Sequence, residues 1–348
     1  EELAAVHGVN LVIGTKDKSK IVELVEDYQA EQGVQNYVTD IMHERVFEPL
    51  EIKKLANRTR AYLKIQDGCS QFCSYCIIPY ARGPIRSRQP EDVIAEVKRL
   101  AENGFKEVVL TGIHVASYGK DLKTITLTDI IRQVHEVEGI ERIRFSSIEP
   151  NVVTEEFAAA MAELPKVCDH FHLSLQSGCD KTLKEMNRKY DTEKYRQAAA
   201  LLRKYLPDVA ITTDIIVGFP GETEEDYQAS RAFAEEIGFS KIHVFPYSPK
   251  KGTPAAARKD QLQNAVKQAR SHDLITVSDR MTDAFLQKHV GKVMPVLFER
   301  CVGDDVYEGH TTNYMKVHAR STKDLSNVIA DTKILSVAEE MAFGEVQA

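Results

Sequence analysis

Residues 61–76 read AYLKIQDGCSQFCSYC, a short alternating strand that runs directly into three cysteines. Alanine, leucine and isoleucine alternate with tyrosine, lysine and glutamine, the period-two pattern of a strand with one buried face. The cysteines form a CxxxCxxC motif in the loop that follows. Loops after the strands form the functional mouth of a βα barrel, so this loop is a candidate active site.

The region after this strand repeats the same order. Short apolar strands alternate with amphipathic helices through six βα units, which predicts a parallel sheet with right-handed crossovers. Pro90, followed by acidic residues, predicts the start of one helix, and Gly104 its end. Fewer than eight strands leave a barrel open on one side. The predicted fold class is therefore α/β, with a partial (β/α)6 barrel.

The chain divides into three predicted domains. Residues 1–50 contain a strand-like run and a helix-like run, which indicate the end of an N-terminal α/β domain. The chain has no starting methionine, so we expect the beginning of that domain to be absent. Residues 51–287 form the partial barrel. Residues 288–348 change to short β-like runs broken by glycine and aspartate, the pattern of a small β-barrel.

A long helix is expected over residues 258–288, at the end of the partial barrel. Its apolar residues recur at helical spacing and form one face. They are Leu262, Val266, Leu274, Val277, Met281 and Phe285.

Strand alternation predicts a polar lumen in the partial barrel. In HFHLSLQ, Phe171, Leu173 and Leu175 form the apolar face that the helices must cover. The histidines, Ser174 and Gln176 then point into the barrel. A closed eight-stranded barrel fills its interior with branched apolar side chains, whereas this lumen is expected to hold water and ligand. The alternative is that some of the polar groups only bond one another.

Composition bounds the class of protein. The chain is 43% hydrophobic and 28% charged, as in soluble globular proteins, and it has neither a membrane-length apolar run nor a secretory signal. Its net charge of −7 argues against a general nucleic-acid binder but leaves room for a local basic groove. Six cysteines are too few for a disulfide scaffold. We therefore expect a cytoplasmic protein with a metal site.

Three clustered thiolates favour an iron–sulfur cluster. They can hold three irons of a [4Fe–4S] cluster and leave the fourth iron free for another ligand. Gly68 permits a tight backbone approach, while Phe72 and Tyr75 can shield a cluster from water. A structural zinc site is the alternative. It would need a fourth ligand, and the next candidate, His114, lies far along the chain.

This motif after a first strand resembles the radical S-adenosylmethionine (SAM) superfamily. The resemblance implies a [4Fe–4S] cluster on Cys69, Cys73 and Cys76, with SAM on the open iron and one-electron cleavage of SAM to a 5′-deoxyadenosyl radical. Further stretches resemble the methylthiotransferases. They are NRTRAYLKIQDGCSQFCSYCIIPYARGPIRSR, EVVLTGIHVASYG, RFSSIEP, HLSLQSG and DIIVGFPGETEEDY.

The combination of LTGIHVASYG with CIIPYARGPIRSR resembles one branch of that family most. That branch 2-methylthiolates N6-threonylcarbamoyladenosine next to the tRNA anticodon. The tail is similar to the TRAM domain, an RNA-binding β-barrel of these enzymes. Two alternatives stay open: a sibling that modifies another tRNA adenosine or a ribosomal protein, and a non-enzymatic RNA-binding protein with structural zinc.

The resemblance also implies contacts with SAM. Tyr75 is expected at the adenine through its backbone, and Thr111 and Gly112 at the amino-acid part. Further polar contacts to SAM or substrate are expected from Ser147, Glu149, Ser174, Gln176 and Asp214. Gly112 could serve only as a turn and Glu149 only as a helix cap.

Basic residues near the mouth are candidates for RNA contacts. Phosphates are expected at Arg82, Arg86 and Arg88 of YARGPIRSR, and at Lys250 and Lys251 further along the chain. The alternative is that these side chains are simply solvated.

The sequence departs from the methylthiotransferase pattern at one point. The family carries three further cysteines in an N-terminal domain for a second [4Fe–4S] cluster, which supplies sulfur, and no cysteine precedes Cys69. Cys168, Cys179 and Cys301 lie too far apart to substitute. We expect the chain as given to cleave SAM without completing methylthio transfer. The expected partners are tRNA, an electron donor and a sulfur source, and no membrane.

Overall fold

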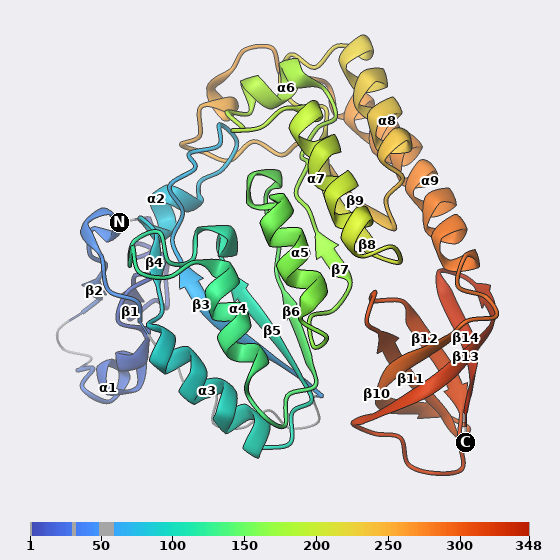
Figure 1. Cartoon of the computed structure of the whole chain (residues 1–348). Coiled ribbons are helices and arrows are strands. Elements are labelled where there is room, and N and C mark those ends of the chain that lie inside the picture. Colours follow the sequence, from blue (N-terminus) through green and yellow to red (C-terminus); the bar gives the residue numbers. More distant parts are fainter. Residues whose placement is uncertain (1, 30–32, 49–58, 348) are drawn as a thin grey trace.

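Six parallel strands form the centre of the protein. The structure is a computed structural model that describes residues 2–29, 33–48 and 59–347. They are β3 (Arg60–Asp67), β5 (Glu107–Gly112), β6 (Arg142–Phe145), β7 (His170–His172), β8 (Ala210–Val217) and β9 (Lys241–Pro246). β3, β5 and β6 pair in one sheet, and β7, β8 and β9 in another. Parallel bridges from Ile143 to Val167 and from Ile148 to Leu173 join β6 to β7. The predicted partial (β/α)6 barrel is confirmed (Figure 1).

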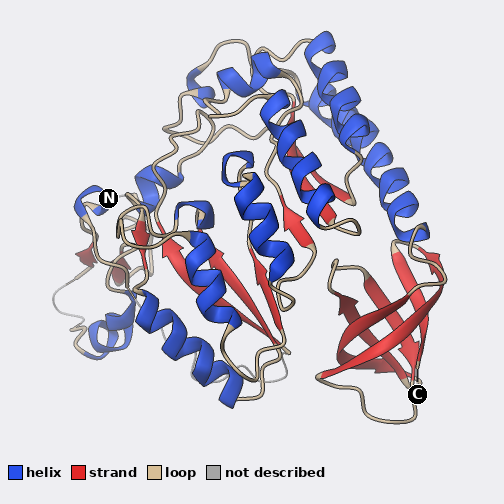
Figure 2. Ribbon diagram, viewed as in Figure 1, coloured by secondary structure: helices blue, strands red, loops and turns tan. Residues whose placement is uncertain are grey.

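Helices cover the apolar face of these strands (Figure 2). They are α3 (Pro90–Glu102), α4 (Leu127–His135), α5 (Glu155–Glu163), α7 (Thr192–Tyr205) and α8 (Glu224–Ile237). The short α6 (Asp180–Glu185) lies beyond the carboxyl ends of the strands, beside the cysteine loop. Helix α3 begins at Pro90 as predicted, and Gly104, with φ of 83°, follows its end. Leu63 and Ile65 of β3 lie in the core with Phe171 of β7. The opposite faces of β3 and β7 therefore point into the lumen, as predicted.

A short antiparallel edge strand was not predicted. The structure places α2 (Ile78–Arg82) after the cysteine loop and then β4 (Arg86–Ser87), which pairs with β3 through Gln66 and Asp67. A strand of only two residues is too short to show a periodic pattern in the sequence. Asp121 fixes the edge strand, because its carboxylate accepts hydrogen bonds from the backbone N–H and the hydroxyl of Ser87.

The long helix α9 (Asn264–Gln287) begins later than predicted and buries a different face at its start. Leu274 and Val277 are buried as expected, but Val266 is exposed. Lys267 and Arg270 are buried instead. Arg270 Nη1 donates to Glu222 Oε1 at 2.6 Å, and Lys267 Nζ donates to the carbonyl of Tyr247 at 3.2 Å. Because Lys267 and Arg270 have hydrogen-bond partners there, these polar side chains lie on the buried face of the helix.

The N-terminal segment contains a parallel pair of strands, β1 (Leu11–Ile13) and β2 (Gln35–Tyr37), with α1 (Ile21–Glu26) between them. This order is typical of an α/β unit. The expected boundary between residues 50 and 51 lies outside the described residues. Among those residues, no helix is both long and apolar enough to span a membrane.

The C-terminal segment closes into a five-stranded β-barrel, as predicted. Its strands are β10 (Val293–Gly303), β11 (Val306–Thr311), β12 (Lys316–Arg320), β13 (Val328–Ala338) and β14 (Met341–Val346). The pairing order is β10-β11-β12-β14-β13, and pairing between β13 and β10 closes the barrel. Val296, Phe298 and Val317 form part of its separate apolar core.

This β-barrel packs against the N-terminal ends of the parallel strands, away from α2 and α6 (Figure 1). Arg142 donates to the carbonyls of His310 and Pro295, both at 2.8 Å. Arg144 donates to the carbonyls of Thr311 and Thr312, both at 2.7 Å. The guanidinium groups of the parallel sheet thus fix the C-terminal barrel in place.

Candidate active site

The cysteine loop leaves β3 through a turn that only glycine fits. Gly68 has φ of 71°, and a Cβ there would lie 1.8 Å from the carbonyl oxygen of Pro84. The backbone N–H of Cys69 donates to the carbonyl of Gly83 at 3.0 Å. The predicted tight backbone approach at Gly68 is therefore confirmed.

Distant segments hold the centre of the loop. The N–H of Ser74 donates to the carbonyl of Met186 at 3.0 Å, and its hydroxyl to the carbonyl of Glu185 at 2.8 Å. The carbonyl of Ser74 accepts a hydrogen bond from the N–H of Ala255 at 2.8 Å. The end of α6 and the segment before α9 thus fix the loop from two sides.

The three thiols of the loop are free, and Cys73 is buried. Burial raises the pKa of Cys69 to about 11, with a smaller contribution from the other two cysteines, and burial also raises the pKa of Cys76. Metals bind the thiolate form, so a bound metal would relieve this penalty. In a [4Fe–4S] cluster each cysteine binds its own iron, and three neighbouring thiols on one loop fit that donor set.

A single-ion site finds less support than a cluster. Within residues 2–29, 33–48 and 59–347, no group of three or more histidine, cysteine, aspartate or glutamate side chains is gathered closely enough to hold one metal ion. Structural zinc is held by four such ligands in a closed tetrahedron.

Arg188 is a site residue that sequence interpretation missed. Its Nη1 donates to Cys73 Sγ at 3.1 Å, and its Nη2 donates to Glu149 Oε1 at 2.8 Å. Its Nε donates to the Tyr190 hydroxyl at 2.9 Å, and the guanidinium lies over the Tyr190 ring. The sequence around it, EMNRKY, has the composition of an ordinary polar turn. Only contact across the fold identifies this arginine as part of the site.

Glu149 is buried at the mouth and held as a carboxylate. Besides Arg188, His114 Nε2 lies 3.2 Å from Glu149 Oε2, and Gln71 Nε2 donates to the same oxygen at 3.4 Å. Burial favours a higher pKa for Glu149, but the bond to His114 and the charge of Arg188 outweigh it, so the pKa lies below its usual value. Glu149 thus links two loops of the mouth.

The predicted SAM contacts lie around the same mouth, at or after the carboxyl ends of the strands. Thr111 and Gly112 end β5, and a Cβ on Gly112 would lie 2.7 Å from Gln66 Oε1, so close packing requires glycine there. Tyr75 lies in the loop, with its hydroxyl 3.5 Å from Arg188 Nη1. Ser147 is exposed. Their contacts with SAM stay predictions.

The remaining predicted contacts come from β8 and from the chain after β7. Ser174 is buried, and its carbonyl accepts from the Tyr190 hydroxyl at 2.8 Å. Gln176 has φ of 70°, and its N–H donates to the carbonyl of Asp214 at 2.8 Å. The Asp214 carboxylate lies 3.2 Å from His172 Nε2. The fold thus brings these side chains to the lumen face that the alternation predicts.

The predicted RNA-contacting arginines are paired within the protein. Arg82 and Arg86 both contact Asp67, at 2.5 and 3.5 Å, and Arg88 lies 3.7 Å from Glu96. Arg86 and Arg88 are buried, which contradicts the expectation that they face phosphates in this conformation. Lys250 and Lys251 are exposed, and Lys251 pairs with Glu2. Their RNA contacts stay predictions.

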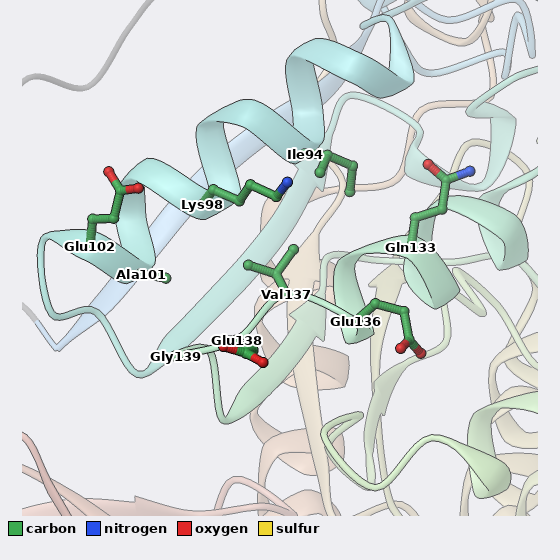
Figure 3. A pocket seen from close by; sticks show the side chains of 9 residues that line it. All are labelled: Ile94, Lys98, Ala101, Glu102, Gln133, Glu136, Val137, Glu138 and Gly139. Atoms are coloured by element: carbon green, nitrogen blue, oxygen red, sulfur yellow. The ribbon is translucent and has the colours of Figure 1, made fainter.

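A groove and a cavity lie away from the cysteine loop. A groove of about 750 Å³ between α3 and α4 is lined by Ile94, Lys98 and Gln133 among others, on the helical outside of the barrel (Figure 3). A cavity of about 290 Å³ lies between the lumen and the C-terminal barrel, lined by His170, His172 and residues of that barrel. Thr212 Oγ1 lies 3.2 Å from His170 Nε2 and 3.1 Å from His172 Nδ1. Some polar side chains of the lumen are therefore hydrogen-bonded to one another.

Comparisons with known proteins agree with this geometry. Residues 63–234 match the family model of the radical SAM superfamily. The chain is 42% identical to the threonylcarbamoyladenosine tRNA methylthiotransferase MtaB of Bacillus subtilis, over 96% of this chain and 75% of that protein. It is 40% identical to a tRNA-2-methylthio-N(6)-dimethylallyladenosine synthase of Thermoanaerobacter sp., over 97% of this chain and 72% of that protein.

Among solved structures, the chain is similar to a radical SAM methyltransferase of Kitasatospora setae. The TM-score is 0.47 at 18% identity, covering 56% of this chain and 38% of that one. The extent and identity of the two sequence matches decide the assignment. The chain belongs to the tRNA methylthiotransferase family of the radical SAM superfamily.

Proposed function

We propose that this chain carries the radical SAM and C-terminal barrel parts of an enzyme that 2-methylthiolates N6-threonylcarbamoyladenosine next to the tRNA anticodon. The choice of this substrate is supported by the 42% identity with the Bacillus subtilis MtaB protein over 96% of the chain. The family uses a [4Fe–4S] cluster and SAM, and the three thiols after β3 fit that donor set.

In this proposal Cys69, Cys73 and Cys76 hold the cluster. With SAM bound, the cluster supplies one-electron cleavage of SAM. Such chemistry suits the target, because a side-chain base works best near pKa 7 and cannot usefully deprotonate an aromatic C–H of adenine. The protein supplies placement, which is its usual part in cofactor chemistry.

The residues of the mouth each have a positioning role. Gly68 sets the turn that presents the cysteines, and Arg188 connects Cys73 to Glu149. The polar lumen, open on one side, receives SAM and the target base. The C-terminal barrel, which packs at the amino ends of the strands, binds a part of the RNA away from the unstacked base in the lumen. The tRNA, an electron donor and a sulfur source are the proposed partners.

N6-Dimethylallyladenosine is the second candidate substrate. The relative with that name is 40% identical over 97% of this chain, which is close to the value for the first candidate. The two substrates differ in chemistry at N6. Threonylcarbamoyl carries a carboxylate, and dimethylallyl is apolar.

Nucleoside mass spectrometry of tRNA from cells lacking the gene decides between them. We expect 2-methylthio-N6-threonylcarbamoyladenosine to disappear, its unmethylthiolated precursor to accumulate, and the dimethylallyl product to stay unchanged. Restoring the full-length gene should restore the product. Persistence of the threonylcarbamoyl product, with loss of the dimethylallyl product, would move the assignment to the second candidate.

A further inference from the structure

A cluster of positive charge lies beside the cysteine loop, around Asp67 at the end of β3. Lys64 Nζ lies 2.5 Å from Asp67 Oδ2, and Arg82 donates to both carboxylate oxygens at 2.5 and 3.0 Å. Arg86 Nη2 lies 3.5 Å from the same carboxylate. Among the residues that the structure describes, three cations thus converge on this one carboxylate.

Within the described parts of the chain, the cations of this cluster outnumber its carboxylates. Lys18 adds a fourth cation whose charge acts on Lys64, and Glu48 adds a second carboxylate near Lys18. Burial and the charges of Arg82 and Lys18 lower the pKa of Lys64, although Asp67 opposes them. Partly buried cations without matching anions are costly, so an added anion would stabilise the cluster.

Lys64 is the member that can reach a ligand. Its neighbours Leu63 and Ile65 are buried in the core, so its side chain points to the lumen face. The side chain of Lys64 is 38% exposed, against 18% for Arg82 and 3% for Arg86. In the sheet Lys64 pairs with Thr111, which lies at the mouth. The ammonium group therefore projects from the lumen face of β3, and it also lies 5.8 Å from the ring centroid of Phe47 in the N-terminal segment.

We propose that Lys64 binds the carboxylate of the substrate's N6-threonylcarbamoyl group. The step is an exchange of partners: the ammonium turns from Asp67 to the substrate, while Arg82 and Arg86 keep Asp67 paired. A dimethylallyl group offers no anion and would leave the cluster unbalanced. A site built for a charged group discriminates strongly against an analogue that lacks it. This inference rests on the proposed function and names its specificity-determining residue.

Binding to anticodon stem-loops tests the role of Lys64. We would measure the affinity of the full-length protein for loops with adenosine, N6-threonylcarbamoyladenosine or N6-dimethylallyladenosine at the target position. Lys64→Met should weaken binding of the threonylcarbamoyl loop roughly 10- to 100-fold, the range for a charged hydrogen bond. Affinity for the adenosine loop should stay unchanged, which also shows that the variant is folded. Lys64→Arg should keep part of the preference.

Two controls separate the carboxylate from other causes. Lys106→Met removes an exposed lysine that pairs with Glu141 at the amino ends of β5 and β6, and should change none of the three affinities. Converting the threonyl carboxylate to its methyl ester should weaken binding to the wild-type protein and leave the affinity of Lys64→Met unaltered. The ester therefore removes the same interaction from the side of the ligand.

The outcomes distinguish the two levels of the proposal. Equal losses for all three loops would show that Lys64 contacts a backbone phosphate, which would overturn the inference. A preference for the threonylcarbamoyl loop that survives in Lys64→Met would overturn it as well and leave the proposed function intact. A wild-type protein with no such preference would overturn the proposed function and the inference together.

Discussion

The two ends of the same parallel strands carry similar charges and use them differently. At the carboxyl ends, Lys64, Arg82 and Arg86 surround Asp67. At the amino ends, three arginines surround Glu107: Arg144 donates to it at 2.9 Å, and Arg60 and Arg142 lie within 4.0 Å.

The two ends differ in which groups accept the remaining hydrogen bonds of the cations. At the amino ends the C-terminal barrel offers four backbone carbonyls, and Glu299 accepts from Arg60 at 2.6 Å. Tyr314 of that barrel stacks on His170 and lies under Arg144. Asp67 is the carboxylate that Lys64 contacts at the open end. The same kind of charge cluster thus joins two domains at one end and is available to a ligand at the other.

The strongest test of the open end removes a thiol. Cys73→Ala should abolish cluster binding and SAM cleavage, because two cysteines leave the cluster with too few protein ligands. After anaerobic reconstitution, the wild-type site should hold about four irons and form 5′-deoxyadenosine, and the variant neither. Cys301→Ala, at an exposed cysteine, is the matched control. Normal 5′-deoxyadenosine production by Cys73→Ala would refute the ligand assignment.

A smaller change tests the turn that presents the cysteines. Gly68→Ala places a Cβ against the Pro84 carbonyl, so the loop must shift and its cluster should be lost faster on gel filtration. Gly104→Ala is the control, because Gly104 also has positive φ but nothing within 4 Å of the added Cβ. Backbone strain alone costs about 1 kcal/mol. Equal cluster retention in both variants would show that the contact with Pro84 is unimportant.

Substitutions at the amino ends of the strands, where the C-terminal barrel packs, should change the stability of the protein rather than its cofactor binding. Glu107→Gln leaves two buried arginines and the partly buried Arg60 without their shared carboxylate and should lower the free energy of unfolding by about 3 kcal/mol. Chemical denaturation followed by circular dichroism measures this change. Glu141→Gln, in an exposed pair with Lys106, should cost less than about 1 kcal/mol. Matching midpoints for the two variants would show that the network at Glu107 adds no stability.

The smallest expected effect is a pH dependence of stability that arises from His170, at the amino ends of the strands. Burial, and next the charge of Arg144, lower the pKa of His170 well below 6.5, so the folded protein keeps this imidazole neutral. The unfolded chain gains the proton near pH 6.5, so stability falls as pH drops from 7.5 to 5.5. The slope from His170 should approach about 1.4 kcal/mol per pH unit.

His170→Gln should flatten this slope, measured as the denaturation midpoint at each pH. His172, His243 and His310 also act on His170, so the remaining dependence reports on them. His272→Gln, at an exposed position of α9, should leave the slope unchanged. An unaltered slope in His170→Gln would assign the effect to the other histidines.

Much of the fold and part of the site follow from local pattern. Alternation in β3 and around β7 places Ile65 and Phe171 in the core and Lys64 and His172 on the lumen face, because successive strand residues point to opposite sides. The cysteine spacing identifies the loop. The register of α9 was predicted less well, since Lys267 and Arg270 are buried through partners that a hydrophobic pattern cannot represent.

The sequence by itself determined the order of the six parallel strands and the helices between them, the cysteine motif and the family. These depend on residues that are neighbours along the chain. Tertiary structure decided that Arg188 meets Cys73 across 115 residues, that Arg86 and Arg88 are buried, and that Lys64 shares Asp67 with two arginines. Coulomb energy depends on distance in space and on burial, and neither can be read from spacing along the chain.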